Sequence, residues 1–119
     1  MANPNIVNVT TIYGNSSSTS LTTTSATSLV SNAASSGKVF KINSIVVANV
    51  DGTSAADITI NVYSQAALGG TAYPIASTIS VPADSTLIVT DKTTSFYLLE
   101  NQSIGATAGT ASDLVVTAS

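Results

Sequence analysis

Residues 57–64, D-I-T-I-N-V-Y-S, alternate strictly between apolar and polar side chains. Ile58, Ile60 and Val62 fall on one face, and the polar side chains, with Tyr63, fall on the other. A period of two is typical of a half-buried β-strand. Helical signals are nearly absent, because the best short candidate, residues 66–68, is stopped at once by two glycines. The pattern therefore predicts an all-β chain.

Further β-prone segments follow at the spacing expected of a sandwich or barrel. They are residues 6–12, 21–30, 38–50, 73–81, 86–90, 95–100, 103–108 and 113–118. Residues 21–30 are rich in Ser and Thr and are expected to form an exposed or edge pair of short segments. Pro74 cannot donate to a ladder, so 73–81 is expected at a sheet edge. We predict one domain over residues 1–119, an antiparallel two-sheet β-sandwich of about eight or nine short strands with Greek-key or jelly-roll connections.

Residues 38–50 read as one long strand that is apolar on both faces around Ile45, Val46 and Val47. Such a strand is expected to be central and covered on both sides at that end. The pair Asp51-Gly52 follows it and marks a turn. Together with 57–64, the segment predicts an antiparallel hairpin.

The N-terminal region leaves two interpretations open. Residues 15–28 are rich in Ser and Thr, which suits either a loop leading into an edge strand or a linker that makes residues 1–14 an arm. Ile6, Val7, Val9 and Ile12 form a β-prone segment whose nearest charged residue is Lys38. This segment is expected either to complete its own sheet, which we favour, or to lie against a neighbouring subunit as a subunit contact.

The amino-acid composition excludes most common classes of catalytic mechanism. The chain has no His, Cys, Trp or Arg, against 37 Ser and Thr. His is the one side chain that titrates unperturbed near neutral pH, Arg supplies forked donors to anions, and Cys and His supply most transition-metal ligands. Serines without a histidine lack the usual activating base. We therefore expect a protein that is not an enzyme, has no catalytic residues, and binds no cofactor and no small-molecule substrate.

The acidic residues do not suggest a metal site. Nearly all of them lie at predicted turns or strand ends, and no cluster is visible among the six: Asp51, Asp57, Asp84, Asp91, Glu100 and Asp113. The loop D-G-T-S-A-A-D at 51–57 has the outline of a calcium loop, but Ala55 and Ala56 stand where ligands are needed. We expect a turn there and no metal.

The charge balance bears on partners. Charged residues make up 8% of the chain, against about 25% in typical soluble domains. The net charge is −3, so there is no basic face to bind nucleic acid. Residues 1–20 lack the features of a secretory leader, and no apolar run approaches a membrane span. A surface of hydroxyls and amides suits a subunit packed against other proteins.

The C-terminal third of the chain resembles a module found in other proteins. The stretch V-P-A-D-S-T-L-I-V-T-D-K-T-T-S-F-Y-L-L-E-N-Q-S-I-G-A-T-A-G-T-A-S-D-L-V-V-T-A-S, residues 81–119, resembles a module of small virion structural proteins of tailed bacteriophages, especially marine phages of cyanobacteria. The opening residues 1–14 and the segment 41–52 are similar to it too. Asn101-Gln102 departs from the Gly-Asp usual at that bend. The pattern commonly continues with Tyr-x-Glu-Ile beyond the position of Ser119, which implies a missing segment or a last strand completed by another chain.

The resemblance implies a function. It implies a non-enzymatic virion protein, most concretely a capsid decoration or cement subunit that binds and stabilises the assembled head. Its partners would be the major capsid protein or neighbouring structural subunits, with self-association, and it would be made in the host cytoplasm without a signal peptide. The alternatives are a neck, tail or fibre component, or a bacterial surface or pilus-like adhesion subunit that polymerises by strand addition. A small enzyme is a third class.

Overall fold

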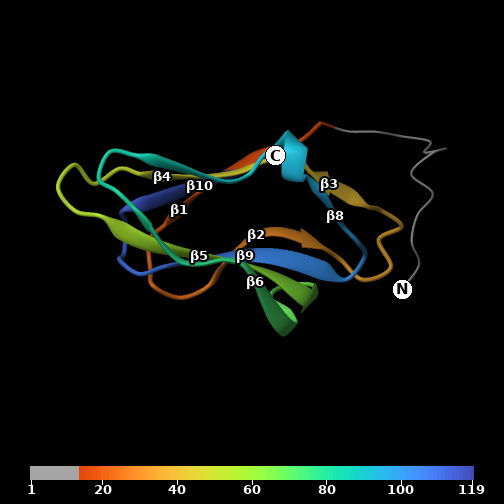
Figure 1. The fold of residues 1–119 in the computed structure, drawn as a ribbon. Helices are drawn as coiled ribbons and strands as arrows, with labels where there is room; N and C mark the ends of the chain where they lie inside the picture. The colour runs from red at the N-terminus through yellow and green to blue at the C-terminus, as the bar shows by residue number, and fades with distance from the viewer. Residues whose placement is uncertain (1–13) are drawn as a thin grey trace.

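The computed structural model describes residues 14–119, which form two packed antiparallel sheets. Sheet A has the order β1 (Ser17–Leu21), β10 (Leu114–Ala118), β4 (Ile45–Asn49), β7 (Thr86–Thr90). Sheet B has the order β2 (Thr27–Asn32), β9 (Gln102–Ala108), β5 (Ala56–Gln65), β6 (Gly69–Val81). A small third sheet pairs β3 (Phe40–Ile42) with β8 (Phe96–Leu98). Figure 1 shows sheet A above sheet B, which confirms the predicted all-β sandwich.

The strands pair in a nested order. β5 pairs with β6, β4 with β7, β3 with β8, β2 with β9 and β1 with β10. The chain is thus one long antiparallel hairpin, which is rolled up so that β10 also pairs with β4 and β9 also pairs with β5. This double-sheet arrangement is a jelly roll. A 3-10 turn, η1 (Lys92–Thr94), joins β7 to β8.

The core lies between the inner faces of the two sheets. Ile58 and Ile60 of β5 are fully buried there, as their alternation predicts. Leu21 and Leu114 of sheet A and Ile104 of the neighbouring strand β9 are also fully buried there. Each such aliphatic side chain contributes about 1.5–3 kcal/mol of burial free energy, so the alternating strands fix which side of each sheet faces inward.

The predicted hairpin of 38–50 with 57–64 is wrong. β4 lies in sheet A between β10 and β7, whereas β5 lies in sheet B between β9 and β6. The Asp51-Gly52 turn exists, but it carries the chain from one sheet to the other. The crossing is held by Asn49, whose buried Nδ2 donates to the carbonyl oxygens of Val81 (2.9 Å) and Ser54 (3.0 Å).

Residues 14–119 contain ten strands, because one expected strand is divided and residues 21–30 contribute to two strands. Residues 38–50 split into β3 and β4 at Asn43 and Ser44, whose amides both donate to the carbonyl oxygen of Ser119. Residues 21–30, expected as an exposed or edge pair of short segments, contribute Leu21 to the end of β1 and residues 27–30 to β2. Both strands lie at sheet edges, as expected, but in different sheets. Val46, expected to be covered, points to the outer face of sheet A and is only half-buried. The expected edge position of Pro74 is confirmed, since β6 borders sheet B.

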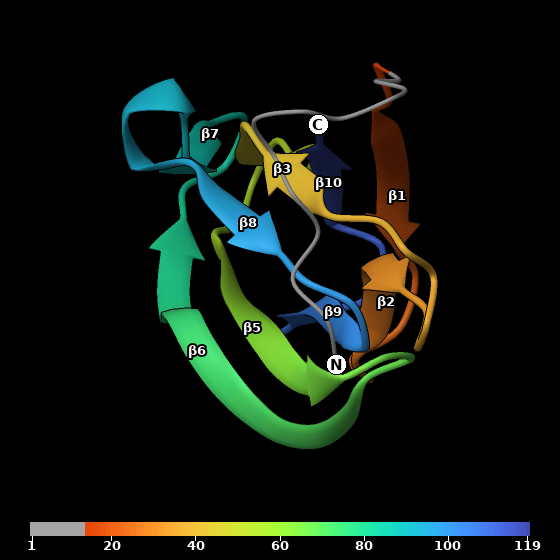
Figure 2. The same ribbon diagram turned by 90° about the vertical axis from the view of Figure 1, so that its right-hand side faces the viewer.

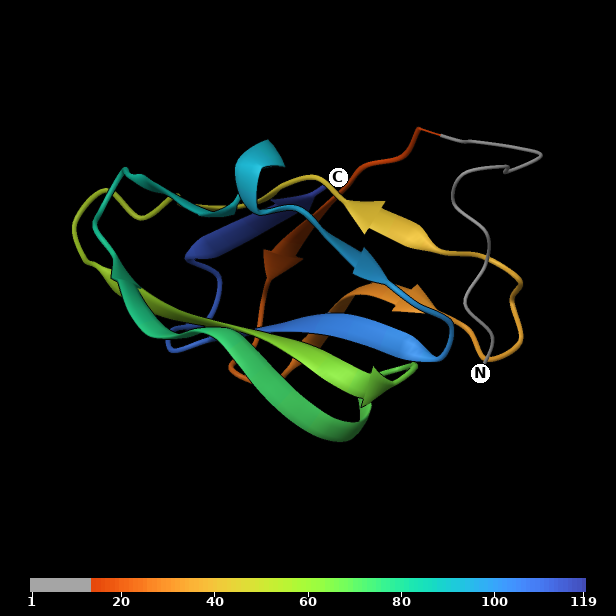
Figure 3. The same cartoon turned by 45° about the vertical axis from the view of Figure 1, so that its right-hand side comes forward.

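The tip of the β5–β6 hairpin folds back onto sheet B, beside the start of β9 (Figure 3). The backbone amides of residues 66, 67 and 68 donate to side-chain oxygens of Asn101, Ser31 and Ser103, at 3.1, 3.0 and 2.9 Å. Ala67 and Leu68 have positive φ angles of 56° and 61°, which makes this segment a tight turn and not the beginning of a helix.

Candidate assembly surface

The outward side chains of sheet A form two rows across its four strands, which we call the A face. The register places Ser18, Thr117, Val46 and Ile88 in one row and Ser20, Val115, Ala48 and Thr86 in the other. None of these side chains is charged, and no strand of sheet A contains a charged residue. The A face is therefore an uncharged sheet surface of hydroxyl and aliphatic groups.

The middle of the A face is aliphatic and its first strand is polar. Val46, Ala48 and Val115 are half-buried by their neighbours, and Ile88 is 62% exposed. Ser18 and Thr117 share a hydrogen bond of 3.0 Å between their hydroxyls. A surface of this composition loses little on desolvation, because apolar groups gain by burial and hydroxyls find new partners readily.

The opposite outer face, on sheet B, is partly covered by the chain itself. Leu68 of the folded hairpin tip and Tyr63 of β5 lie over Gly105, where an added Cβ would lie 2.6 Å from Leu68 Cδ2 and 3.0 Å from Tyr63 Cε2. Ser103 is fully buried beneath it, accepting from Leu68 N and donating to the carbonyl oxygen of Gln65. Glycine at 105 thus makes room for an internal cover on the outer face of sheet B.

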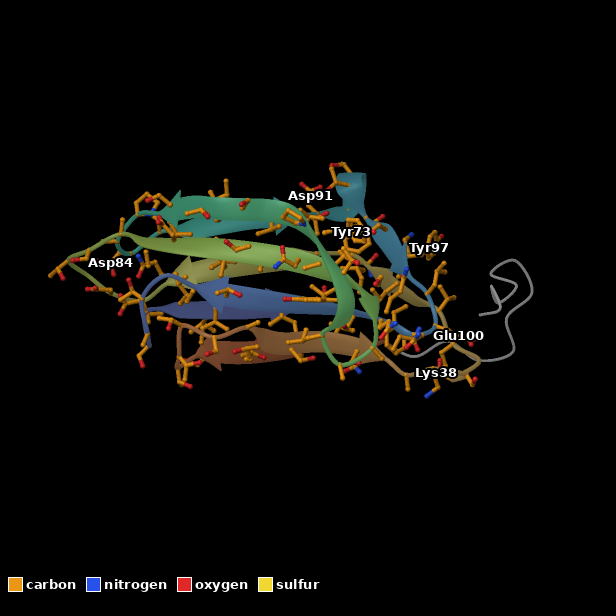
Figure 4. All side chains as sticks on the ribbon, turned by 90° about the horizontal axis from the view of Figure 1, so that it is seen from below. Lys38, Tyr73, Asp84, Asp91, Tyr97 and Glu100 are labelled. Carbon is orange, nitrogen blue, oxygen red and sulfur yellow. The ribbon has the colours of Figure 1, made fainter. Side chains whose placement is uncertain are left out.

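The charges divide between the two ends of the sandwich, whose longest dimension is 48 Å. At one end, loop contacts bring Asp84 N to the carbonyl oxygen of Asp51 (3.1 Å) and Val50 N to that of Asp113 (2.8 Å). Four of the six acids gather there: Asp51, Asp57, Asp84 and Asp113. The three lysines and the other two acids lie toward the far end; Figure 4 shows Asp84 opposite Lys38 and Glu100. The A face lies between the two charged ends.

The loop that resembles a calcium site is occupied by its own hydrogen bonds. Oδ1 of Asp51 accepts from the amide and from the hydroxyl of Thr53, each at 2.9 Å, and these bonds lower the pKa of Asp51. Asp91 does the same at η1, where the side chain and then the backbone of Thr93 lower its pKa. Both acids act as turn caps, as Asp commonly does.

The other features considered in the sequence analysis give no site within the described residues. Ile6, Val7, Val9 and Ile12 lie outside the described residues. Within residues 14–119, no group of three or more His, Cys, Asp or Glu could hold a metal ion. No helix of this region is long and apolar enough to cross a membrane. A hollow of about 120 Å³ at Glu100 and Asn101 is well below the ~300–1,000 Å³ of typical ligand pockets.

The A face is a candidate surface that sequence reasoning missed. The signal was present, since 45–49, 86–90 and 114–118 are all free of charge on both faces. Only the register could show that their outward residues meet in two rows. In comparisons with known proteins, no family model, curated protein or solved structure matched this chain.

Proposed function

We propose that this protein is a non-enzymatic structural subunit of a tailed-bacteriophage particle, most concretely a decoration or cement subunit that binds and stabilises the assembled head. The observation that carries the proposal is the A face, with its eight outward side chains and no charge. The resemblance of residues 81–119 to phage virion proteins supports the particle as the partner. Jelly rolls also occur among viral capsid domains, which adds an argument from analogy alone.

The mechanism is stabilisation by mass action. A subunit that binds the assembled shell and not its free components lowers the free energy of the assembled state by its binding free energy. Copies at symmetry-related positions contribute together, so a modest affinity at each site is sufficient. No reacting group is needed, and the subunit has only to present a rigid surface that matches the shell.

The A face predicts how this binding responds to salt. Exposed charges are screened over about 8 Å at physiological ionic strength, whereas contacts between apolar and hydroxyl groups are not. Binding to particles should therefore change little between ~0.05 and ~0.5 M salt. Release of the subunit by moderate salt would contradict an interface made by the A face.

The test is a sedimentation assay. Heads and tails from the phage that encodes the chain are separated and freed of this protein, and the labelled full chain is then added to each. We expect the chain to sediment with heads. Thr117→Lys places a charge in the middle of the A face and should weaken binding at least tenfold, because an unpaired charge is desolvated. Thr71→Lys, at a residue of β6 that is also exposed, is the control and should bind normally.

Three results would change the proposal. Sedimentation with tails alone would favour a neck or tail role, and sedimentation with neither would reject a virion role. Equal binding by the Thr117→Lys and Thr71→Lys variants would show that another surface is used.

A further inference from the structure

The two main sheets have four edge strands, and three of them are guarded against pairing with another strand. Figure 2 shows β6 and β7 along one side of the sandwich and β1 and β2 along the other. β6 contains Pro74, which has no amide hydrogen, and its register against β5 shifts repeatedly. β2 has a register shift at residue 29 against β9, and β7 has one at residue 89 against β4. Proline and bulges are devices that keep an edge from pairing.

β1 alone among these four strands carries none of the guards. Its residues pair with β10 in an unbroken register, and it contains no proline, no charged residue and no positive φ. Among residues 14–119, β10 is the one strand that pairs with it. The other side of β1 is therefore a regular open edge, which is the kind of edge to which a further strand can be added.

The main-chain groups of β1 alternate between β10 and the open edge, and the hydrogen bonds of β10 show which residues face which side. Ser119 directly follows β10 and exchanges both main-chain hydrogen bonds with Ser44, beside β4, at 2.9 and 3.2 Å. Successive residues of a strand direct these groups to alternate sides, so the even-numbered residues of β10 face β1. Their partners in β1 are the odd-numbered residues. The amides and carbonyls of Ser18 and Ser20 therefore point to the open edge.

We propose that β1 pairs antiparallel with β1 of a second copy of this chain, in the register that places Thr19 opposite Thr19. A two-fold interface must be self-complementary. In this register Ser18 of each copy lies opposite Ser20 of the other, so the residues with edge-facing groups meet each other and each such pair exchanges both main-chain hydrogen bonds. No charge opposes a like charge, because β1 has none, and opposed hydroxyl side chains stabilise a strand pair.

The geometry of β1 selects this register. A slip by one residue would place an edge-facing residue opposite one that bonds to β10, and an outward side chain opposite an inward one. A slip by two would pair Ser18 or Ser20 with a residue beyond the end of β1. The register centred on Thr19 avoids both faults.

The pairing also extends the surface described above. Ser18 and Ser20 are the β1 members of the two rows of the A face. Because Ser18 of one copy lies opposite Ser20 of the other, each row continues into the other row of the second copy. Sheet A and its uncharged outer face then become continuous across both copies, which is an argument for a second copy as the partner.

Single cysteines test the contact, because the chain has none of its own. The two copies of Thr19 would have Cα atoms about 4.5 Å apart, within disulfide reach. Under mild oxidation, Thr19→Cys should therefore form a covalent dimer at least tenfold faster than Thr71→Cys on β6. Thr19 is half-buried and Thr71 is exposed, so random collision would give the opposite order. Thr19→Cys that cross-links no faster than Thr71→Cys overturns the proposal, and would leave the edge to a strand of another protein or to residues 6–12.

A mixture of Ser18→Cys and Ser20→Cys chains tests the register. Opposed residues that exchange hydrogen bonds have Cα atoms about 5.5 Å apart, whereas diagonal neighbours are about 7–8 Å apart, at or beyond the limit for a disulfide. In either variant alone the two cysteines would be diagonal neighbours. The mixture should therefore cross-link at least tenfold faster than either variant alone, and equal rates would overturn this register.

A proline tests whether the main chain makes the contact. Ser20→Pro removes an edge-facing amide and leaves the hydrogen bonds to β10, so the far-UV circular dichroism should stay unchanged. In the Thr19→Cys background, this substitution should slow cross-linking at least tenfold. Undiminished cross-linking would overturn pairing through the β1 main chain. None of these experiments involves phage particles, so the dimer and the proposed function fail separately.

Discussion

Asn49 should be worth several kilocalories per mole to this fold, because one buried side chain ties the two sheets together. Its Nδ2 donates to the carbonyl oxygens of Ser54 and Val81, and its Oδ1 accepts from the amide of Asp51 at 2.9 Å. Asn49 is 3% exposed, so water cannot replace all of these partners after truncation. Asn49→Ala removes three hydrogen bonds, each worth about 0.5–1.5 kcal/mol net, from a site that is closed to bulk water. We expect a loss of about 2–4 kcal/mol in the free energy of unfolding.

Urea denaturation followed by far-UV circular dichroism measures this loss. For a chain of this size about 4 °C of Tm corresponds to 1 kcal/mol, so the thermal midpoint should fall by roughly 8–16 °C. Asn61→Ala is the matched control, since Asn61 is half-buried on the outer face of sheet B and should cost less than about 1 kcal/mol. Equal losses for the two variants would refute the role assigned to Asn49.

The other predictions concern the core, the covered glycine and a capped turn. Ile60→Ala should lower the free energy of unfolding by about 2–5 kcal/mol, because Ile60 is fully buried. Thr59→Ala, on the opposite face of β5, should lower it by about 1 kcal/mol or less. Comparable denaturation midpoints for the two variants would contradict this assignment of faces. Gly105→Val should cost about 1–3 kcal/mol by forcing apart the side chains above it, and an unchanged midpoint would show that they yield freely. The pKa of Asp91 is lowered by the side chain and backbone of Thr93, so its stabilising effect is complete above the unfolded pKa of about 3.9 and is lost as pH falls through the folded value. Wild type should therefore lose more stability between pH 7 and pH 3 than Asp91→Asn, and parallel curves would argue against the cap.

The local sequence pattern predicted well where the strands lie, but it predicted poorly which strands pair with each other. The alternation at 57–64 identified β5 and its buried Ile58 and Ile60, because a period of two follows from strand geometry alone. The same reasoning paired the wrong strands across Asp51-Gly52. The Asp51-Gly52 pair indicates that the chain turns there, but it does not indicate which sheet the chain enters next. That choice depends on contacts distant in sequence, such as Asn49 with Val81.

For the candidate assembly surface, the sequence predicted the kind of side chains but not the strands that carry them. The scarcity of charge indicated contacts made by apolar and hydroxyl groups, and the sequence directed attention to Ile6, Val7, Val9 and Ile12, which the described residues do not include. The A face requires β1, β10, β4 and β7 to lie side by side, and these strands come from widely separated parts of the chain. No local pattern carries that order.

The nested pairing has a consequence for biosynthesis. β10 separates β1 from β4 in sheet A, and β9 separates β2 from β5 in sheet B. As the chain leaves the ribosome, β2 therefore has no partner strand until β9 has been made, and β1 has none until β10 has been made. The β5–β6 hairpin can close early, because a short loop costs little entropy, but both sheets must wait for β9 and β10 to insert between strands already synthesised. Nascent chains halted before residue 102 should therefore remain sensitive to protease, and the sandwich should close only after β10 has emerged.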